Sequence, residues 1–290
     1  ALLFFLRVST VTAVRGQGAS EQPEEPIQLL PPGEVDSART LRVLDGDTVT
    51  EMTFSDYLQG VLRAEMPASF AQDALCAQTV AARTYTYYKM QNGGNHGDTA
   101  DICTDHTCCQ AFLGKDRAAD NWGKNAERYE AKIENAVSAT DGQVMLYGGT
   151  PILAVFHSSS AGETWNSGQV WAQDLPYLQS VSSPEGEGVP NYYSTVELTE
   201  AEFREKFLAA RPEADLSGPA SEWIQDPVTD GVHVERITIG GVPVSGPSVR
   251  SIFGLRSASF TAEAGDGKIT FYVTGYGHGV GMSQYGANAM

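Results

Sequence analysis

The sequence predicts an α+β fold in which helices and β-hairpins alternate. Three pairs of strand-forming segments flank glycine-containing turns, at Asp45-Gly46, Gly148-Gly149 and Gly240-Gly241, and such dipeptides are typical of tight hairpins. Other segments have apolar residues at helical spacing and capping residues at their ends. Helices and hairpins do not follow the regular spacing of βαβ units, which argues against a doubly wound parallel sheet.

The N-terminal part of the chain differs in composition from the rest. Residues 1–15 contain an apolar run that is too short for the ~20 residues of a spanning helix. We interpret them as the remnant of a signal or membrane anchor, with an ordinary buried segment as the alternative. Residues 16–39 are polar and proline-rich, which predicts a flexible linker. The remainder, 40–290, can form one large domain or two lobes, about 40–140 and 141–290.

The first helix of the domain is predicted from a capping pair, Thr53 and Asp56, to a stop at Pro67. Glu65 then lies in the last helical turn. There the negative end of the helix dipole and burial among apolar neighbours both raise the pKa of its carboxyl group. A carboxylic acid that keeps its proton near neutral pH can serve as a general acid.

A second helix is predicted directly after the first. Ser69 and Gln72 read as its capping box, and the segment has enough alanine for close helix packing. This helix carries Gln78, Arg83 and Tyr85.

Three more helices are predicted further along the chain. The first covers residues 121–140, the second covers 197–211 and ends before Pro212, and a short third one is closed by Gly254.

The net charge of the chain is −17. A protein that binds nucleic acid must neutralise phosphates with a basic surface. The acidic composition therefore argues against a nucleic-acid partner.

Three of the four cysteines, Cys103, Cys108 and Cys109, cluster in one short segment, and His96 precedes them. Three thiolates and one imidazole make a closed tetrahedral set of zinc ligands, which is the arrangement of a structural site. A disulfide between Cys103 and Cys108 or Cys109 is an alternative, and thiols without a ligand are another. Cys76 lies alone in the second predicted helix and is expected to be a buried helix residue.

Four sequence blocks together resemble one protein family. They are YLQGVLRAEMPASF with ALCAQTVAARTYTYY, then ADICTDHTCCQAF, FHSSSAGETW and GYGHGVGMSQYGANAM. The family is the stage II sporulation protein D (SpoIID) and LytB-related family, and the resemblance extends from about Leu41 to Met290. It implies a lytic transglycosylase that cleaves the glycan strands of peptidoglycan during endospore engulfment. The family's catalytic acid is the glutamate of an EMP motif, which is Glu65 here.

The resemblance also implies a metal site and substrate contacts. Some family members hold zinc with a His, a Cys, a His and a Cys. The matching positions here are His96, Cys103, Cys108 and Cys109, so a cysteine replaces the second histidine. Contacts to the glycan are implied for Arg83, Tyr85, Ser159, Ser160, Gly162, Thr164, His278 and Gln284.

Several of these residues also have simpler interpretations. Arg83 can be an exposed charge on a helix surface, and His278 can be a structural histidine although glycines surround it. His157 and Ser158 are neighbours in a predicted strand, so their side chains point to opposite faces and cannot form a nucleophilic pair.

A lytic transglycosylase can work with one acid, whereas ordinary glycosidases need two carboxylates. The acid protonates the glycosidic oxygen. As a carboxylate it then accepts the proton of the C6 hydroxyl of N-acetylmuramic acid, which closes a 1,6-anhydro ring. Possible second acids are Asp56, Asp73, Asp101 and Glu163.

The alternative function is not enzymatic. LytB-type relatives enhance amidases, so the chain could present glycan to another enzyme. The resemblance implies an amidase, SpoIIP, and a membrane scaffold, SpoIIM, as partners. Together with the N-terminal anchor, it predicts an extracytoplasmic protein that is held at the membrane.

Overall fold

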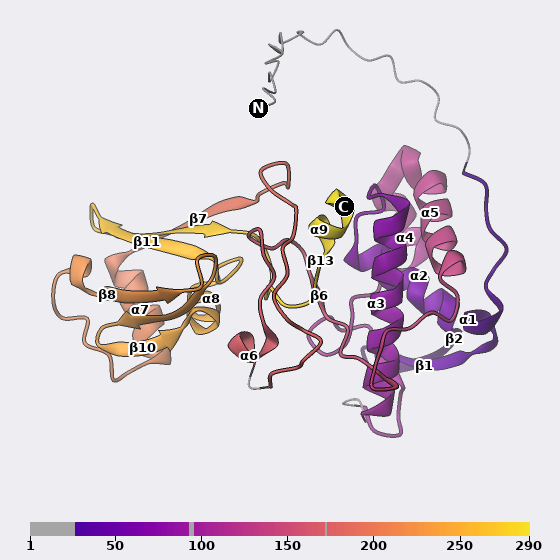
Figure 1. Cartoon of the computed structure of the whole chain (residues 1–290), viewed down its shortest axis with the longest axis horizontal. Coiled ribbons are helices and arrows are strands. Elements are labelled where there is room, and N and C mark those ends of the chain that lie inside the picture. Colours follow the sequence, from indigo (N-terminus) through magenta and orange to yellow (C-terminus); the bar gives the residue numbers. More distant parts are fainter. Residues whose placement is uncertain (1–26, 93–95, 172) are drawn as a thin grey trace, which may run out of the picture.

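The computed structural model describes residues 27–92, 96–171 and 173–290. Two lobes lie at opposite ends of the molecule, with a layer of short strands and loops between them (Figure 1). Each of the larger sheets has three strands, and most strand pairs are antiparallel. The predicted α+β class is confirmed.

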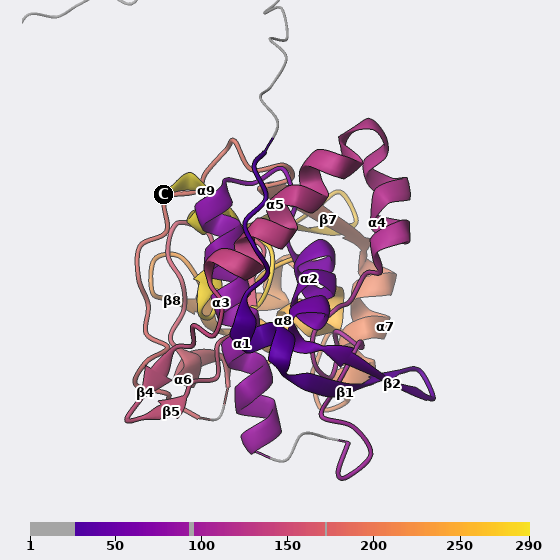
Figure 2. The same ribbon diagram turned by 90° about the vertical axis from the view of Figure 1, so that its right-hand side faces the viewer.

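The first lobe is mainly helical. Figure 2 looks onto it: α2, α3 and α5 pack together, and the β1–β2 hairpin lies at one edge. Its core contains completely buried side chains from each of these helices, among them Leu62, Leu75 and Ile133. The elements of this lobe are α1 (Glu34–Ala38), β1 (Thr40–Asp45), β2 (Thr48–Thr53), α2 (Phe54–Glu65), α3 (Gln72–Gln91), β3 (Ile102–Cys103), α4 (Lys115–Trp122) and α5 (Ala126–Ala139).

The second lobe contains two three-stranded sheets, in the orders β10-β9-β8 and β11-β12-β7. Phe203 of α7, Phe253 of α8 and Phe271 of β12 stack in its core. The elements of this lobe are β7 (Tyr193–Thr199), α7 (Glu200–Ala210), β8 (Ile224–Thr229), β9 (Val234–Ile239), β10 (Val242–Ser245), α8 (Gly246–Phe253), β11 (Phe260–Gly265) and β12 (Lys268–Thr274).

The middle layer brings the end of the chain back to the first lobe. Strands β6 and β13 pair in parallel, and α9 follows β13 and lies beside α3 (Figure 1). A Cβ at Gly281 would clash with the carbonyl oxygen of Val155, so only glycine permits this approach of the two segments. The elements of this layer are β4 (Leu146–Tyr147), β5 (Thr150–Pro151), β6 (Phe156–His157), α6 (Ser167–Val170), β13 (Met282–Ser283) and α9 (Gln284–Ala289).

The three predicted hairpins are confirmed as β1–β2, β4–β5 and β9–β10. Their turn glycines have positive φ: Gly148 and Gly149 have values of 58° and 84°, and Gly240 and Gly241 have values of 55° and 77°. Two successive positive φ angles are what a type I′ turn requires.

The predicted helix pair is confirmed, but one of its caps is wrong. The Thr53 side chain accepts a hydrogen bond from the N–H of Asp56 and caps α2, which ends at Glu65. Helix α3 begins at Gln72 with Ala71 as its N-cap, without the predicted Ser69 capping box. The Gln72 side chain instead donates to the carbonyl oxygen of Lys132 in α5.

Two later helices differ from prediction at their boundaries. The segment 121–140 is divided between α4 and α5, because Gly123 adopts a φ of 53° and interrupts the helix. The segment 197–211 begins as strand β7, and helix α7 starts after a capping box formed by Thr199 and Glu202. The predicted short helix is α8, which Gly254 closes in the left-handed conformation.

A helix precedes Thr40, so the predicted linker over 16–39 extends too far at its C-terminal end. Residues 34–38 form α1, and Asp36 within it is 1% exposed because it is ion-paired in the core. The proposed anchor at 1–15 and residues 16–26 lie outside the described residues. Among the described helices, none is long and apolar enough to cross a membrane.

Candidate functional site

Glu65 is the last residue of α2, and its side chain is partly buried. Its Oε1 atom accepts a hydrogen bond of 2.7 Å from the N–H of Ala111. Burial raises the pKa of the carboxyl group, whereas this hydrogen bond and nearby His106 lower it, and the net shift is upward. The predicted direction is confirmed, with burial as the largest cause.

The final sequence block fixes the backbone at Glu65. The Gln284 side chain donates one hydrogen bond of 2.8 Å to the carbonyl oxygen of Glu65 and another of 3.2 Å to Oε1 of Gln78. Gln284 is 7% exposed and Gln78 is completely buried. The fold therefore brings together residues from α2, α3 and α9, and Gln284 holds the Glu65 backbone as a buried neighbour.

Sequence reasoning missed Glu185, which connects two of the blocks. Its carboxylate accepts hydrogen bonds from the Ser160 N–H and from the hydroxyls of Ser183 and Ser283. Burial alone would raise the pKa of Glu185, but these hydrogen bonds outweigh it and the pKa is lowered. Ser283 directly precedes Gln284, so Glu185 supports the segment that holds Glu65.

A close approach of backbone confirms how tightly this junction is packed. A Cβ at Gly286 would lie 2.7 Å from Oε2 of Glu185 and closer still to Oγ of Ser183. Gly286 of the closing block thus lies in close contact with the side chains of Ser183 and Glu185. No local pattern around Glu185 distinguishes it from an exposed loop acid, which is why the sequence did not indicate it.

The structure does not support the predicted roles of Arg83 as a glycan contact or as a surface charge. Its guanidinium is completely buried and forms an ion pair of 2.6 Å with Asp36, with further hydrogen bonds to Thr140 and the Gln143 carbonyl. A side chain without exposed surface cannot be a surface charge, and in this conformation it cannot contact a sugar. Arg83 attaches α1 and α5 to α3.

The polar residues of the serine-rich block are also placed in the interior. Ser159, Ser160 and Thr164 are 4%, 3% and 3% exposed. The Ser159 backbone pairs with Tyr276 in both directions, and Oγ1 of Thr164 accepts from the Val181 N–H. As folded here these side chains do not reach a ligand, so their predicted sugar contacts lack support. Gly162 adopts a φ of 102° at the turn, and its contact stays a prediction.

His278 and Tyr85 lie in two different environments. The His278 ring packs 5.6 Å from His157 and 5.3 Å from Trp171, and burial lowers its pKa to about 3. It is therefore neutral near pH 7. Burial, with the neighbouring cysteine thiols, raises the pKa of Tyr85 to about 12, so that its phenol stays protonated beside the cysteine cluster.

Two of the other candidate acids, Asp56 and Asp101, are engaged elsewhere. Asp56 accepts a hydrogen bond from the Thr53 hydroxyl at the start of α2. Asp101 forms a 2.9 Å ion pair with Arg42, which outweighs partial burial and lowers the pKa of the Asp101 carboxyl group. Glu163 is exposed. Glu65 differs from them in combining partial burial with a raised pKa.

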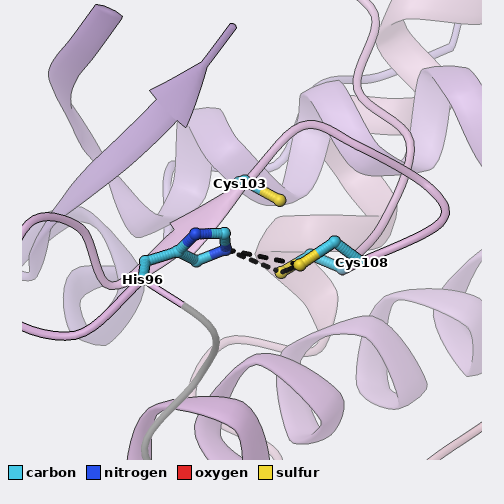
Figure 3. Close-up of side chains that lie close together, drawn as sticks. His96, Cys103 and Cys108 are labelled. Carbon is cyan, nitrogen blue, oxygen red and sulfur yellow. Dashed lines mark hydrogen bonds between the residues drawn. The ribbon is translucent and has the colours of Figure 1, made fainter. Parts of the chain in front are cut away.

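The cysteine cluster has the geometry of a metal site. The ligand atoms of His96, Cys103, Cys108 and Cys109 all lie within 4.8 Å of one another. Figure 3 shows His96, Cys103 and Cys108 close together. Nε2 of His96 is 3.4 Å from Sγ of Cys109 and 3.6 Å from Sγ of Cys108, and the two sulfur atoms are 3.7 Å apart. Tetrahedral zinc bond lengths require N–S edges of about 3.6 Å and S–S edges of about 3.8 Å. Three of the four donors therefore already have the spacing of a tetrahedral set, and Sγ of Cys103 lies within 4.8 Å of each of them.

The disulfide alternative receives no support. All four cysteines lie in the described residues and none forms a disulfide. His106, close in sequence, has a side chain that is 77% exposed and lies outside the cluster.

The metal cluster and Glu65 share one loop. Cys109 is followed by Gln110, which donates to Oγ1 of Thr86 in α3, and then by Ala111, whose N–H binds the Glu65 carboxylate. An ion at the cluster would fix this loop two residues from the hydrogen bond to Glu65. The site would thus support the acid without reaching a substrate.

Comparison with known proteins agrees with the sequence blocks. Residues 45–147 match the family model described as "SpoIID: Stage II sporulation protein". Stage II sporulation protein D of Bacillus amyloliquefaciens is 35% identical over 244 residues, covering 84% of this chain and 70% of that protein. The protein of the same name from Bacillus subtilis (strain 168) is 36% identical over 244 residues, with the same coverage.

A second kind of relative is also found. An amidase enhancer of Bacillus subtilis (strain 168) is 29% identical, over 80% of this chain and 37% of that protein. Both sporulation proteins align along most of this chain at more than a third identity, and the region matched by the family model contains Glu65 and the cysteine cluster. The chain belongs to the stage II sporulation protein D family.

Proposed function

We propose that the protein is a peptidoglycan lytic transglycosylase with Glu65 as its single catalytic acid. The observation that carries the proposal is the raised pKa of a partly buried Glu65 whose Oε1 is oriented by the Ala111 N–H. A group in this state can hold a proton near neutral pH and release it to a substrate oxygen. Membership of a family of sporulation proteins and relation to an amidase enhancer favour a cell-wall substrate.

The mechanism needs one group that acts twice. Protonated Glu65 donates its proton to the glycosidic oxygen, and the bond to the N-acetylmuramic acid unit breaks. The resulting carboxylate is stabilised by the Ala111 N–H and accepts the proton of the C6 hydroxyl as the 1,6-anhydro ring closes. Burial and the hydrogen bond act in opposite directions on the pKa, which keeps both protonation states accessible.

The test is mass spectrometry of glycan strands digested by the purified protein. The wild-type protein should release anhydro-muropeptides, and Glu65→Gln should lower the rate by about 10²–10⁴-fold, as expected for loss of a general acid. Glu51→Gln changes an exposed glutamate of β2 and is the matched control. If Glu65→Gln has an unchanged melting curve and still releases products at the wild-type rate, Glu65 is not the catalytic acid.

A second function is favoured by the relation to the amidase enhancer. In that case the protein presents glycan to an amidase and cleaves nothing itself. The same digestion distinguishes the two: a protein that yields no anhydro products but raises the rate of a peptidoglycan amidase is an enhancer.

We further propose that the cluster of His96, Cys103, Cys108 and Cys109 holds one structural zinc ion. The fit of the ligand spacing to tetrahedral zinc supports this choice of metal. Bound zinc would supply stability to the loop that orients Glu65. The four protein ligands leave no open position for water, and Glu65 needs none.

The remaining proposals rest on family membership. They are an extracytoplasmic location, attachment to the membrane through the N-terminal residues, and partnership with an amidase of the SpoIIP type and a scaffold of the SpoIIM type. Fractionation of cells that produce the full-length protein, followed by co-purification, tests all three.

A further inference from the structure

We propose that a cavity on the outer face of the β11-β12-β7 sheet binds a neutral N-acetylhexosamine unit of a glycan strand, away from Glu65. This inference extends the proposed function, on which the choice of a glycan as ligand rests. The cavity has a volume of about 410 Å³ and lies between this sheet and the loop that contains Ala161.

The sheet has one apolar face and one face with exposed aromatic residues. Ile269, Phe271 and Val273 of β12 point into the core and are at most 1% exposed. Residues alternate along a strand, so Tyr272 points outward and is 46% exposed, and Tyr193 of β7 is 61% exposed. Large exposed aromatic side chains are costly in water and commonly mark a binding surface.

The two tyrosines are arranged as neighbours. Tyr193 lies opposite Thr274 in the β7–β12 register, and Tyr272 is two residues before Thr274 on the same face. This diagonal relation places their rings within reach of one ligand. Tyr193 is also held in place, because its ring packs edge-on against Tyr192, which is 7% exposed, at 5.0 Å.

A buried hydroxyl in the cavity lacks a partner. Ser259 is 4% exposed and lines the cavity, and its Oγ makes no hydrogen bond with the described residues. The Ser259 hydroxyl is buried as deeply as those of the serine-rich block, so in this conformation we assign the polar contacts with the ligand to other hydroxyls. The hydroxyls of Thr261 and Thr274 line the same cavity.

The uncharged lining of the cavity indicates which class of ligand fits it. The chain has a net charge of −17, yet none of the described residues that line this cavity is charged. A pyranose ring has apolar C–H faces that pack on aromatic rings and hydroxyl edges that bind polar groups, which matches tyrosines beside threonines. N-acetylglucosamine is uncharged. N-acetylmuramic acid carries a carboxylate when its peptide is removed, and this cavity offers it no cation.

The cavity is connected to Glu65 through hydrogen bonds. Ala161 lines it, and the N–H of adjacent Ser160 donates to Glu185, which also binds Ser283 next to Gln284. A sugar in the cavity would therefore lie on segments that are linked by hydrogen bonds to the one that holds the acid. We expect it to hold a strand in register while another unit is cleaved.

The test is calorimetric binding of tetra-N-acetylchitotetraose to the full chain. This probe lacks N-acetylmuramic acid, so it reports binding without cleavage. Tyr193→Ala and Tyr272→Ala should each weaken binding about tenfold or more, as for aromatic residues at the centre of a binding site. Tyr193→Phe should retain most of the affinity, because the ring face is kept.

Two controls separate this site from the proposed active site. Glu65→Gln should bind the probe as the wild-type protein does, and so should Tyr147→Ala, a tyrosine of β4 that is 53% exposed. If the probe binds in a tyrosine-dependent way but the protein releases no anhydro products, the sugar-binding site stands and the proposed transglycosylase activity is refuted. Absence of probe binding by the wild-type protein, or unchanged binding by both alanine variants, overturns the proposal. If those variants instead lose a protein partner, the face is a protein interface and the sugar site is refuted.

Discussion

The guanidinium of Arg83 lies 2.6 Å from the carboxylate of Asp36, and both side chains are almost completely excluded from water, at 0% and 1% exposure. The pair joins the middle of α3 to a short helix from the segment before β1. A buried charge is tolerated only when its partner is present, because desolvation is costly for an isolated ion. Arg83 therefore contributes mainly to the stability of the fold.

Removal of Arg83 should destabilise the protein strongly. Arg83→Ala leaves Asp36 buried without a counter-charge, and such losses typically cost about 3–5 kcal/mol in the free energy of unfolding. Arg42→Ala removes the more exposed pair with Asp101 and should lower stability far less. Denaturant unfolding measures both. Unchanged stability of Arg83→Ala together with lost turnover would return Arg83 to the substrate site.

Glu65 should make stability depend on pH in a defined direction. Its folded-state pKa is raised above the ordinary 4.5, so the stability that it contributes is present below that value and is lost as pH rises through the folded pKa. The amide side chain of the Glu65→Gln variant cannot ionise and escapes this loss. The variant should therefore become more stable relative to the wild-type protein as pH rises. If the unfolding free energies of the two proteins depend on pH in the same way, the raised pKa is contradicted. Turnover of the wild-type protein should fall over the same pH range, because a smaller fraction of Glu65 is protonated.

The metal site predicts a separable effect on stability. Cys109→Ser removes one thiolate from the cluster, and zinc content by elemental analysis should fall from one per chain to near zero. A stability loss of a few kcal/mol would lower Tm by roughly 5–10 °C, and activity should fall only as the Glu65 loop loosens. Cys76→Ser changes a cysteine of α3 outside the cluster and should keep the metal. Full zinc content in Cys109→Ser would show that the ligands are assigned wrongly.

Local chemistry explains which features the sequence predicted. Two successive glycines fix a hairpin turn, and Thr53 caps α2 through a residue only three positions away. The long-range contacts of Asp36 with Arg83 and of Glu185 with Ser283 could not be predicted in this way, since the partners lie 47 and 98 residues apart. Burial of both carboxylates depends on the assembled fold.

Glu185 should act on Glu65 through the final block and not by touching substrate. Glu185→Gln leaves the Ser160 N–H and the hydroxyls of Ser183 and Ser283 with a weaker acceptor, at a cost of about 1–3 kcal/mol. Because its folded-state pKa is lowered from 4.5, the stability from Glu185 is present above that value and is lost as pH falls through the folded pKa. The variant should thus differ most from the wild-type protein near neutral pH and least in acid.

A double-mutant cycle with Gln284→Ala tests the route to Glu65. Glu185 is expected to position Ser283, and thereby Gln284 and the Glu65 backbone. In that case the two substitutions disturb the same contacts, and the fold-loss in kcat of the double variant is smaller than the product of the two single fold-losses. The pH dependence of the remaining activity should still follow Glu65, because the acid itself is unchanged. Glu163→Gln, an exposed acid near the serine-rich block, is the matched control and should leave kcat near the wild-type value. Effects of Glu185→Gln and Gln284→Ala that multiply independently would show that Glu185 stabilises the fold without positioning the acid.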